Sequence, residues 1–207
     1  MAFEEYDDFE QEKLVKDWIK NNWLTIATGL ILGLGGVFGM NYWKAQKQQE
    51  RFDIANQYQS FTEVFKLSEF DEAKKLLTEL ESKSGANFYT YEGHLLLAKE
   101  FAGKGELENA ASELKKVIDA KPDQLITDVV KLRLARVYNG MEKYDDALTQ
   151  AQSVETESLM SIAQEVQGDS HLAKGNSKEA ISAYESAVDK GDGYSGKRNI
   201  EIKIENA

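Results

Sequence analysis

The chain of 207 residues contains no cysteine and a single proline, Pro122. Without cysteine it cannot form disulfides, bind an iron–sulfur cluster, use a catalytic thiolate or carry a lipoprotein anchor. The absence leaves the compartment open, since many periplasmic and cytoplasmic proteins contain no cysteine. The lone proline, together with the near absence of strand-like alternation before the last few residues, predicts an all-α protein.

Motifs that carry chemistry are equally scarce. No Walker loop, nucleophile elbow or Ser-His-Asp order occurs in the sequence. The two histidines, His94 and His171, have only Glu92 and Asp169 nearby as further metal ligands, too few for a site. A literal Gly-x-Gly-x-x-Gly at 191–196 follows a helical segment and not a strand, so it does not indicate a dinucleotide site. We therefore expect no enzyme, no metal and no cofactor.

Runs of Lys and Arg interleaved with aromatic residues are also missing. Residues 44–207 hold 22 basic and 29 acidic side chains, which gives this part of the chain a formal net charge of −7. Such a surface repels phosphate backbones, and nucleic-acid binding is not expected.

What the sequence does contain is one long uncharged stretch, Asn21 to Trp43. At ~1.5 Å per residue, the part from Trp23 onward extends ~31 Å, which matches the hydrocarbon core of a bilayer. Tryptophan at both edges suits the two headgroup regions. A cleavable signal peptide is the alternative, but the leader is acidic and no Ala-x-Ala pattern follows the apolar run. We predict an acidic leader over 1–22, a transmembrane helix over 23–43 and one domain over 44–207.

Small residues are concentrated in this predicted span. Five glycines within eleven residues leave bare helix faces that another membrane helix can approach: Gly29, Gly33, Gly35, Gly36 and Gly39. We predict that they pack against a neighbouring helix, and the sequence leaves open whether it belongs to a second copy or to another protein.

Charge does not decide the orientation of the span. Three basic residues precede it and three follow it closely: Lys13, Lys16 and Lys20 before, and Lys44, Lys47 and Arg51 after. A short amino-terminal leader before a long carboxy-terminal domain favours export of that domain, and the reverse orientation stays open.

The domain over 44–207 contains a repeat. Four short segments end in alanines spaced 37, 37 and 33 residues apart: Phe70–Ala73, Leu107–Ala110, Tyr144–Ala147 and Ser177–Ala180. A period in the thirties is typical of stacked helical hairpins. In the second unit, Leu97 and Phe101 lie on a first helix, Gly105 ends the turn, and Leu107 opens a second helix.

These units resemble tetratricopeptide repeats, most closely over Leu97-Ala98, Phe101, Gly105, Ala110, Leu114 and Pro122, although His94 stands where tryptophan is common. We predict a right-handed α-solenoid of about four helical hairpins after the transmembrane helix. An ordinary helical bundle is the alternative.

The whole chain is similar to the YfgM-like family. The likeness is carried by Tyr6-Asp-Asp, by the run Gln11 to Trp23 and by the glycine-rich span, followed by tetratricopeptide-like hairpins. The resemblance implies a single-pass protein of the bacterial inner membrane with a cytoplasmic amino terminus and a periplasmic repeat domain. It also implies an ancillary subunit of the SecYEG protein-export channel, paired with a membrane-anchored, prolyl-isomerase-like periplasmic chaperone.

A solenoid has one concave surface lined by its first helices, and the register predicts which residues lie there. They are Tyr58, Phe65, Glu92, Leu95, Lys99, Leu132, Arg136 and Asn139. Apolar residues among charged ones suit capture of an extended or helical peptide, either of the chaperone or of an exported client. Carboxy-terminal elements that fill this groove are the alternative. The tail Asn199–Glu205 alternates like a strand, yet a short capping helix would serve equally.

We therefore expect a binding module that performs no chemistry itself. A membrane-tethered regulator that sequesters a soluble signalling protein is the second hypothesis, with either the domain or the acidic leader as its contact.

Overall fold

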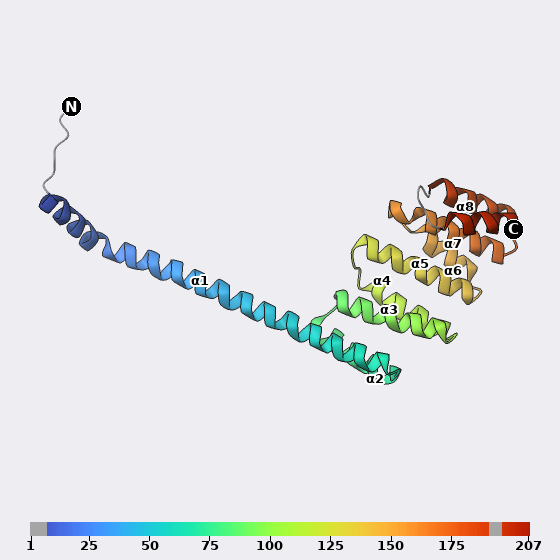
Figure 1. The fold of residues 1–207 in the computed structure, drawn as a ribbon, viewed down its shortest axis with the longest axis horizontal. Coiled ribbons are helices and arrows are strands. Elements are labelled where there is room, and N and C mark those ends of the chain that lie inside the picture. Colours follow the sequence, from blue (N-terminus) through green and yellow to red (C-terminus); the bar gives the residue numbers. More distant parts are fainter. Residues whose placement is uncertain (1–7, 191–195) are drawn as a thin grey trace, which may run out of the picture. The chain divides into compact units, whose positions relative to one another are not determined.

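The computed structural model describes residues 8–190 and 196–207, and every regular element in these two ranges is helical (Figure 1). The all-α prediction is thereby confirmed for the described part of the chain. The chain divides into two units, residues 1–53 and 54–207.

Within the described residues, the first unit is one uninterrupted helix from Asp8 onward. Helix α1 (Asp8–Lys66) contains the whole predicted span, and its apolar window is long enough to cross a membrane and has no part buried inside the protein. The Thr28 hydroxyl donates to the Leu24 carbonyl at 2.7 Å, so this polar group finds its partner within the helix. The polar side chain is therefore compatible with an apolar surrounding.

The second unit starts with the last turns of α1 and continues as a series of short helices. Helices that follow one another along the chain pack against each other. The elements are α2 (Phe70–Ser84), α3 (Phe88–Gly103), α4 (Leu107–Asp119), α5 (Gln124–Gly140), α6 (Tyr144–Gln152), the 3-10 turn η1 (Glu157–Leu159), α7 (Met160–Ala173), α8 (Ser177–Lys190) and α9 (Lys197–Glu205).

The four repeated segments mark four helix starts, because α2, α4, α6 and α8 begin at their first residues. The alanine that closes each segment is completely buried: Ala73, Ala110, Ala147 and Ala180. A methyl side chain at these positions lets the preceding helix approach closely. Gly168 on α7 extends this principle, since a Cβ there would lie 2.3 Å from the ring of Tyr184 on α8.

The turns before these helices share one geometry. Each contains a residue with positive φ, and these residues recur with the same spacing as the alanines: Ser68, Gly105, Glu142 and Gly175. In each turn an N–H group beyond the helix end bonds to a carbonyl five residues earlier, as from Glu106 to Phe101 at 2.8 Å. Only two of the four left-handed positions are glycine, so the other two carry some strain.

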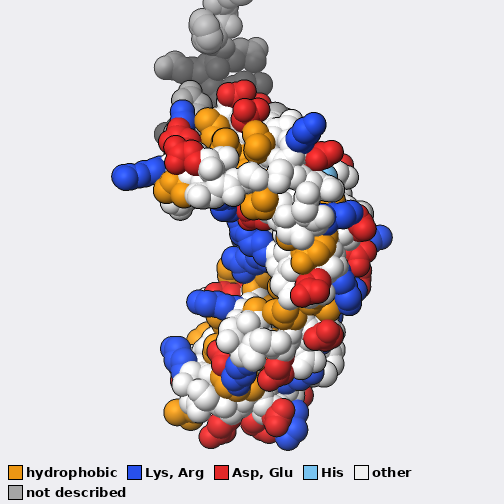
Figure 2. Space-filling view, turned by 90° about the vertical axis from the view of Figure 1, so that its right-hand side faces the viewer, with side chains coloured by type: hydrophobic (Ala, Val, Ile, Leu, Met, Phe, Trp, Pro, Cys, Tyr) orange, Lys and Arg blue, Asp and Glu red, His pale blue; other side chains and the backbone are white. Residues whose placement is uncertain are grey.

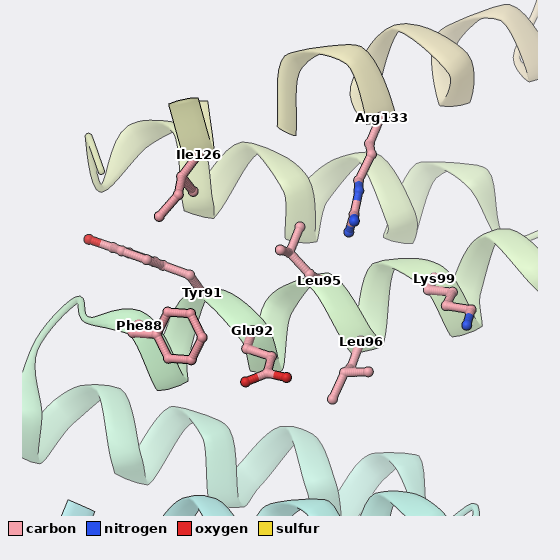
Figure 3. A pocket seen from close by; sticks show the side chains of 8 residues that line it. All are labelled: Phe88, Tyr91, Glu92, Leu95, Leu96, Lys99, Ile126 and Arg133. Carbon is pink, nitrogen blue, oxygen red and sulfur yellow. The ribbon is translucent and has the colours of Figure 1, made fainter. Parts of the chain in front are cut away.

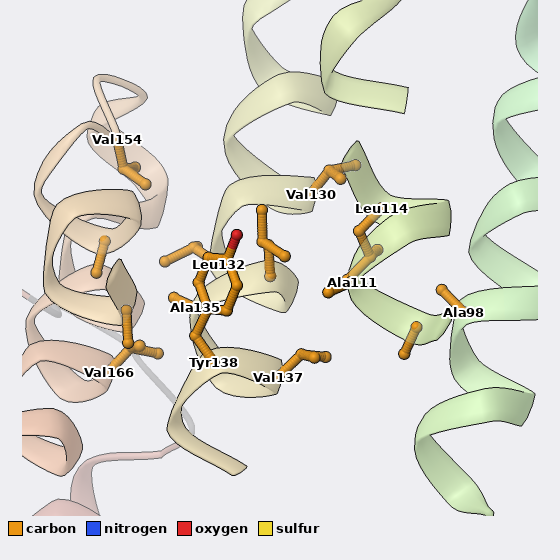
Figure 4. Packing of buried hydrophobic residues seen from close by; sticks show 14 of the residues in the cluster. Ala98, Ala111, Leu114, Val130, Leu132, Ala135, Val137, Tyr138, Val154 and Val166 are labelled. Carbon is orange, nitrogen blue, oxygen red and sulfur yellow. The ribbon is translucent and has the colours of Figure 1, made fainter. Parts of the chain in front are cut away.

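The largest core runs through the middle of the stack. It contains small and branched side chains from α3 to α7, among them Ala98, Leu114, Val130, Ala135 and Val166 (Figure 4). Two smaller clusters join the end of α1 to α2 and α3, and α8 to α9. The apolar stripes predicted from the repeat thus form three buried clusters along the stack.

A buried carboxylate fixes the connection between α6 and α7. Asp128 on α5 is fully buried and accepts hydrogen bonds from the backbone N–H groups of Glu155 and Thr156 at 2.9 and 2.8 Å. The Thr156 hydroxyl donates to the same oxygen at 2.7 Å. Burial alone raises the pKa of Asp128, but these bonds and one from Gln124 outweigh it, so the pKa lies below its ordinary value of 3.8.

The carboxy-terminal tail is helix α9 and not a strand, which decides between the two possibilities that the alternation left open. Ile200 is fully buried against the α8 cluster. Lys203 donates to Glu165 at 2.8 Å and to Asp169 at 2.6 Å, and Asp169 also accepts from the Tyr184 hydroxyl at 2.8 Å. Helix α9 therefore covers the end of the stack formed by α7 and α8.

Candidate binding groove

A groove lies between α3 and α5 in the second unit. It consists of two hollows of about 390 and 420 Å³ that share Leu95, Lys99 and Arg133. Viewed as a surface, the second unit is hollowed on one side, and Lys and Arg side chains gather in the hollow beside apolar ones (Figure 2). We call this surface the α3–α5 groove.

Two helix caps bring the mouth of the groove together. Asn87 precedes α3, and its side chain accepts from the N–H groups of Tyr89 and Thr90. Asp123, directly after Pro122, precedes α5 and accepts from the N–H of Ile126 at 2.9 Å. Because α3 and α5 pack on either side of α4, these caps help fix the first turns of the two helices that line the groove.

The lining changes in character along the groove. Phe88, Tyr91 and Ile126 lie toward one end of the first hollow, while Arg133 and Lys99 lie toward the other, with Leu95 between them (Figure 3). The second hollow adds Ala98, Ala102, Leu114, Arg136 and Val137. The groove therefore has an apolar end and a cationic end over an aliphatic floor.

Four of the eight predicted groove residues line this groove: Glu92, Leu95, Lys99 and Arg136. The other four lie elsewhere. Leu132 is 3 % exposed and belongs to the core, and Asn139 accepts a hydrogen bond from Ser170 of α7 at 2.8 Å. Tyr58 and Phe65 pack around Phe61 in the cluster formed by α1, α2 and α3.

The groove also contains residues that the register did not predict, among them Phe88, Tyr91, Ile126 and Arg133. On α5 the lining residues follow the helical spacing Ile126, Arg133, Arg136 and Val137, so the true stripe lies one residue away from Leu132. One residue turns a helix by ~100°, which is enough to exchange a groove position for a core position. The pair Arg133 and Arg136, three residues apart, was the available signal.

Glu92 lines the first hollow and also contacts a side chain outside it. It is half-buried and accepts a hydrogen bond from the Tyr58 hydroxyl. Burial first, and then this bond and the Glu92 charge, raise the pKa of Tyr58 well above its ordinary value. In Figure 3 the Glu92 carboxylate points away from Arg133.

His94 belongs to a buried ionic cluster behind the groove. It is 4 % exposed, and its Nδ1 lies 2.7 Å from a Glu113 oxygen, which also accepts from Lys116 at 3.1 Å. Burial raises the pKa of Glu113, but the bonds from His94 and Lys116 lower it more, so the net shift is downward. The sequence signal was Glu113 itself, which interrupts the inward stripe between Ala110 and Val117. In the described ranges no three His, Asp or Glu side chains form a cluster that could hold a metal ion.

The glycines of the predicted span face open space. A Cβ at any of the five would meet no atom of the described chain within 4 Å: Gly29, Gly33, Gly35, Gly36 and Gly39. Their packing role therefore stays a prediction about a second molecule. The glycine motif at 191–196 lies outside the described residues, apart from Gly196.

Comparison with known proteins places the chain among repeat proteins. A family model described as a tetratricopeptide repeat-like domain matches residues 16–207. The chain is 30% identical over 179 residues to an ancillary SecYEG translocon subunit of Escherichia coli, covering 86% of each chain. It is 31% identical over 194 residues to the protein of that name from Haemophilus influenzae, covering 92% of this chain and 93% of that one.

A third relative with the same name, from Aggregatibacter actinomycetemcomitans, is 25% identical over 199 residues, covering 95% of this chain and 97% of the relative. No solved structure matches the chain.

Proposed function

Because the chain belongs to the YfgM-like family of proteins with a tetratricopeptide repeat-like domain, we propose that it is an ancillary subunit of the SecYEG protein-export channel. The observation that carries this proposal is the name shared by three relatives that match at least 86% of this chain. The fold supports an interaction role, since the groove offers a surface on which a segment of another protein can lie.

The proposed layout has three parts. Residues 1–22 form a cytoplasmic leader, 23–43 cross the inner membrane once, and 44–207 form a periplasmic domain. The exposed apolar surface of α1 supports the anchor, because side chains such as Ile31 and Phe38 are 71% exposed and suit a lipid surrounding. The five span glycines are the proposed contact with a helix of the channel or of another membrane protein.

The periplasmic domain docks a membrane-anchored, prolyl-isomerase-like chaperone and presents it, or exported clients, near the channel exit. Its mechanism is a raised local concentration. Two domains that are tethered to one membrane patch associate more strongly without any new contact between them. The proposed docking surface is the α3–α5 groove, which is open on the described chain because α9 packs on α8 instead.

Affinity purification of the full chain after crosslinking in native membranes tests this proposal. We expect the channel subunits and the chaperone to be recovered together with the chain after detergent extraction. A matched variant replaces the five span glycines by leucine and keeps the helix apolar, and it should recover less of the channel. Recovery of neither partner by the unaltered chain would contradict the proposed function.

A further inference from the structure

Three basic side chains of the α3–α5 groove form no ion pair within the described residues, although the chain has more acidic than basic residues. The chain has 36 acidic and 25 basic residues, yet Lys99, Arg133 and Arg136 form no ion pair with any residue in the described ranges. Neighbouring lysines behave differently, since Lys116 pairs with Glu113 and Lys131 with Asp128. An acidic protein that leaves three like charges around one groove holds a local positive potential there.

The apolar end of the same groove is exposed. Phe88, which lines the first hollow, is 65% exposed. Large exposed side chains that rim a pocket are typical of surfaces that bind another protein. The groove thus combines aromatic anchors at its mouth with cations farther along α3 and α5 (Figure 3).

We propose that the groove binds an acidic amphipathic segment of a partner protein in one direction. Apolar side chains of the segment lie against Phe88, Tyr91 and Ile126, and its carboxylates face Lys99, Arg133 and Arg136. The inference rests on the proposed function in taking a protein as ligand, and it adds the chemistry and the direction of that ligand. Under the proposed topology the acidic leader of this chain lies across the membrane, so the segment belongs to another protein.

The aliphatic floor favours a peptide over an anionic lipid headgroup. Leu95, Ala98 and Val137 lie under the cationic part, so the aliphatic stem of an acidic side chain can pack on them while its carboxylate faces the cations, whereas a phosphate would be contacted by the cations alone. The two hollows, at about 390 and 420 Å³, are each in the range that accommodates compact side chains.

Peptide binding to the full chain in phosphatidylcholine nanodiscs tests the inference. The probe is a labelled helix-forming peptide with Phe and Leu at one end and glutamates at the other, and binding is followed by fluorescence anisotropy. We expect it to bind roughly five- to twenty-fold more tightly at low salt than the peptide with glutamine in place of glutamate. The difference should shrink as the salt concentration rises. Equal affinities at low salt would overturn the inference.

Variants of the chain assign the effect to the groove. Arg133→Gln with Arg136→Gln should remove most of the preference for glutamate, whereas Lys83→Gln, at an exposed position of α2 outside the groove, should keep it. Charge reversal guards against misfolding, since Arg133→Glu with Arg136→Glu should instead prefer a third peptide that carries lysine in place of glutamate. A charge-reversed variant that binds the glutamate and lysine peptides with equal affinity would overturn the inference, provided its thermal unfolding matches that of the unaltered chain.

Two further outcomes separate this inference from lipid binding and from the proposed function. Displacement of the acidic peptide by soluble short-chain phosphatidylglycerol, but not by short-chain phosphatidylcholine, would assign the cations to a lipid headgroup and overturn it. If the chain recovers the channel but binds the glutamate and glutamine peptides with equal affinity, the inference is overturned while the proposed function is left intact.

Discussion

Side chains of the same kind have opposite surroundings in the two units of this chain. Ile31 and Phe38 of α1 are 71% exposed, whereas Leu134 and Val166 of the second unit are almost completely buried. The second unit buries its apolar side chains by packing helix against helix. The first unit has no such partner within the described chain, and its exposed apolar surface costs free energy in water until a bilayer covers it.

The largest expected effect comes from placing charge on the exposed apolar surface. The double variant Ile31→Arg, Leu34→Arg should lose about 2.5–3.5 kcal/mol of insertion free energy for each arginine. We expect carbonate to extract much of this variant from membranes, while the unaltered chain stays in the pellet. Leu67→Arg, at an exposed position of the second unit, is the control and should not change extraction. Retention of the double variant would weaken the comparison.

The second effect concerns burial within the second unit. Leu134→Ala should lower the free energy of unfolding by about 2–5 kcal/mol, because it leaves a cavity in the central core. Leu125→Ala removes the same atoms from a side chain that is 52% exposed. It should change the free energy of unfolding by less than about 0.5 kcal/mol. Urea unfolding of the full chain in mild detergent, followed by circular dichroism, measures both. Similar losses would show that the two leucines share one environment.

Asp128 tests whether the second unit also depends on a buried charge. Asp128→Asn should cost about 1.5–3 kcal/mol, because a charged acceptor of several hydrogen bonds becomes a neutral one. Proteolysis should then cut the connection after α6 more readily. Protection equal to that of the unaltered chain would indicate that this connection is held by other contacts.

The same residue predicts a dependence on pH. The pKa of Asp128 is lower in the folded chain than its ordinary value of 3.8. Its stabilisation is therefore complete above the unfolded pKa and is lost as the pH falls below about 4 toward the folded value. The unaltered chain should lose more stability than Asp128→Asn between about pH 6 and about pH 3. Parallel curves for the two proteins would contradict this assignment.

The smallest effect concerns the turns of the repeat. Glu142 has a φ of 60°, a conformation that glycine adopts with less strain. Glu142→Gly should therefore raise the free energy of unfolding by up to about 1 kcal/mol. Gly105→Ala, at the equivalent turn with φ of 79°, should lower it by about 1 kcal/mol. Thermal unfolding of both variants checks the opposite signs. A shift in the same direction for both would mean that the two turns are not equivalent.

Much of the fold could be predicted because the same sequence pattern for a helix start occurs four times. The segments that begin at Phe70, Leu107, Tyr144 and Ser177 each open a helix, since small buried alanines and a left-handed turn recur together at intervals of 37, 37 and 33 residues. The tail Asn199–Glu205 could not be assigned in this way, because seven residues are too few to separate the helical period of about 3.6 residues from the strand period of two. Burial of Ile200 against α8 decided for a helix.

The groove was only partly predictable. Periodicity placed Leu95 and Lys99 correctly on α3, where one stripe runs from the cap at Asn87. On α5 it placed Arg136 correctly but chose Leu132 in place of Arg133, because neighbouring residues of a helix are separated only by the packing that buries Leu132 in the core. Tyr58 was lost for a different reason, since the packing of the end of α1 on Tyr89 depends on contacts between distant residues.

The most direct test of the whole account is the side of the membrane on which the second unit lies. A tag after Ala207 should be digested by protease added to intact spheroplasts, while a tag before Met1 should be protected until the membrane is lysed. This result would fit an anchor that crosses once and presents a binding domain to the periplasm. Protection of the carboxy-terminal tag in intact spheroplasts would contradict it.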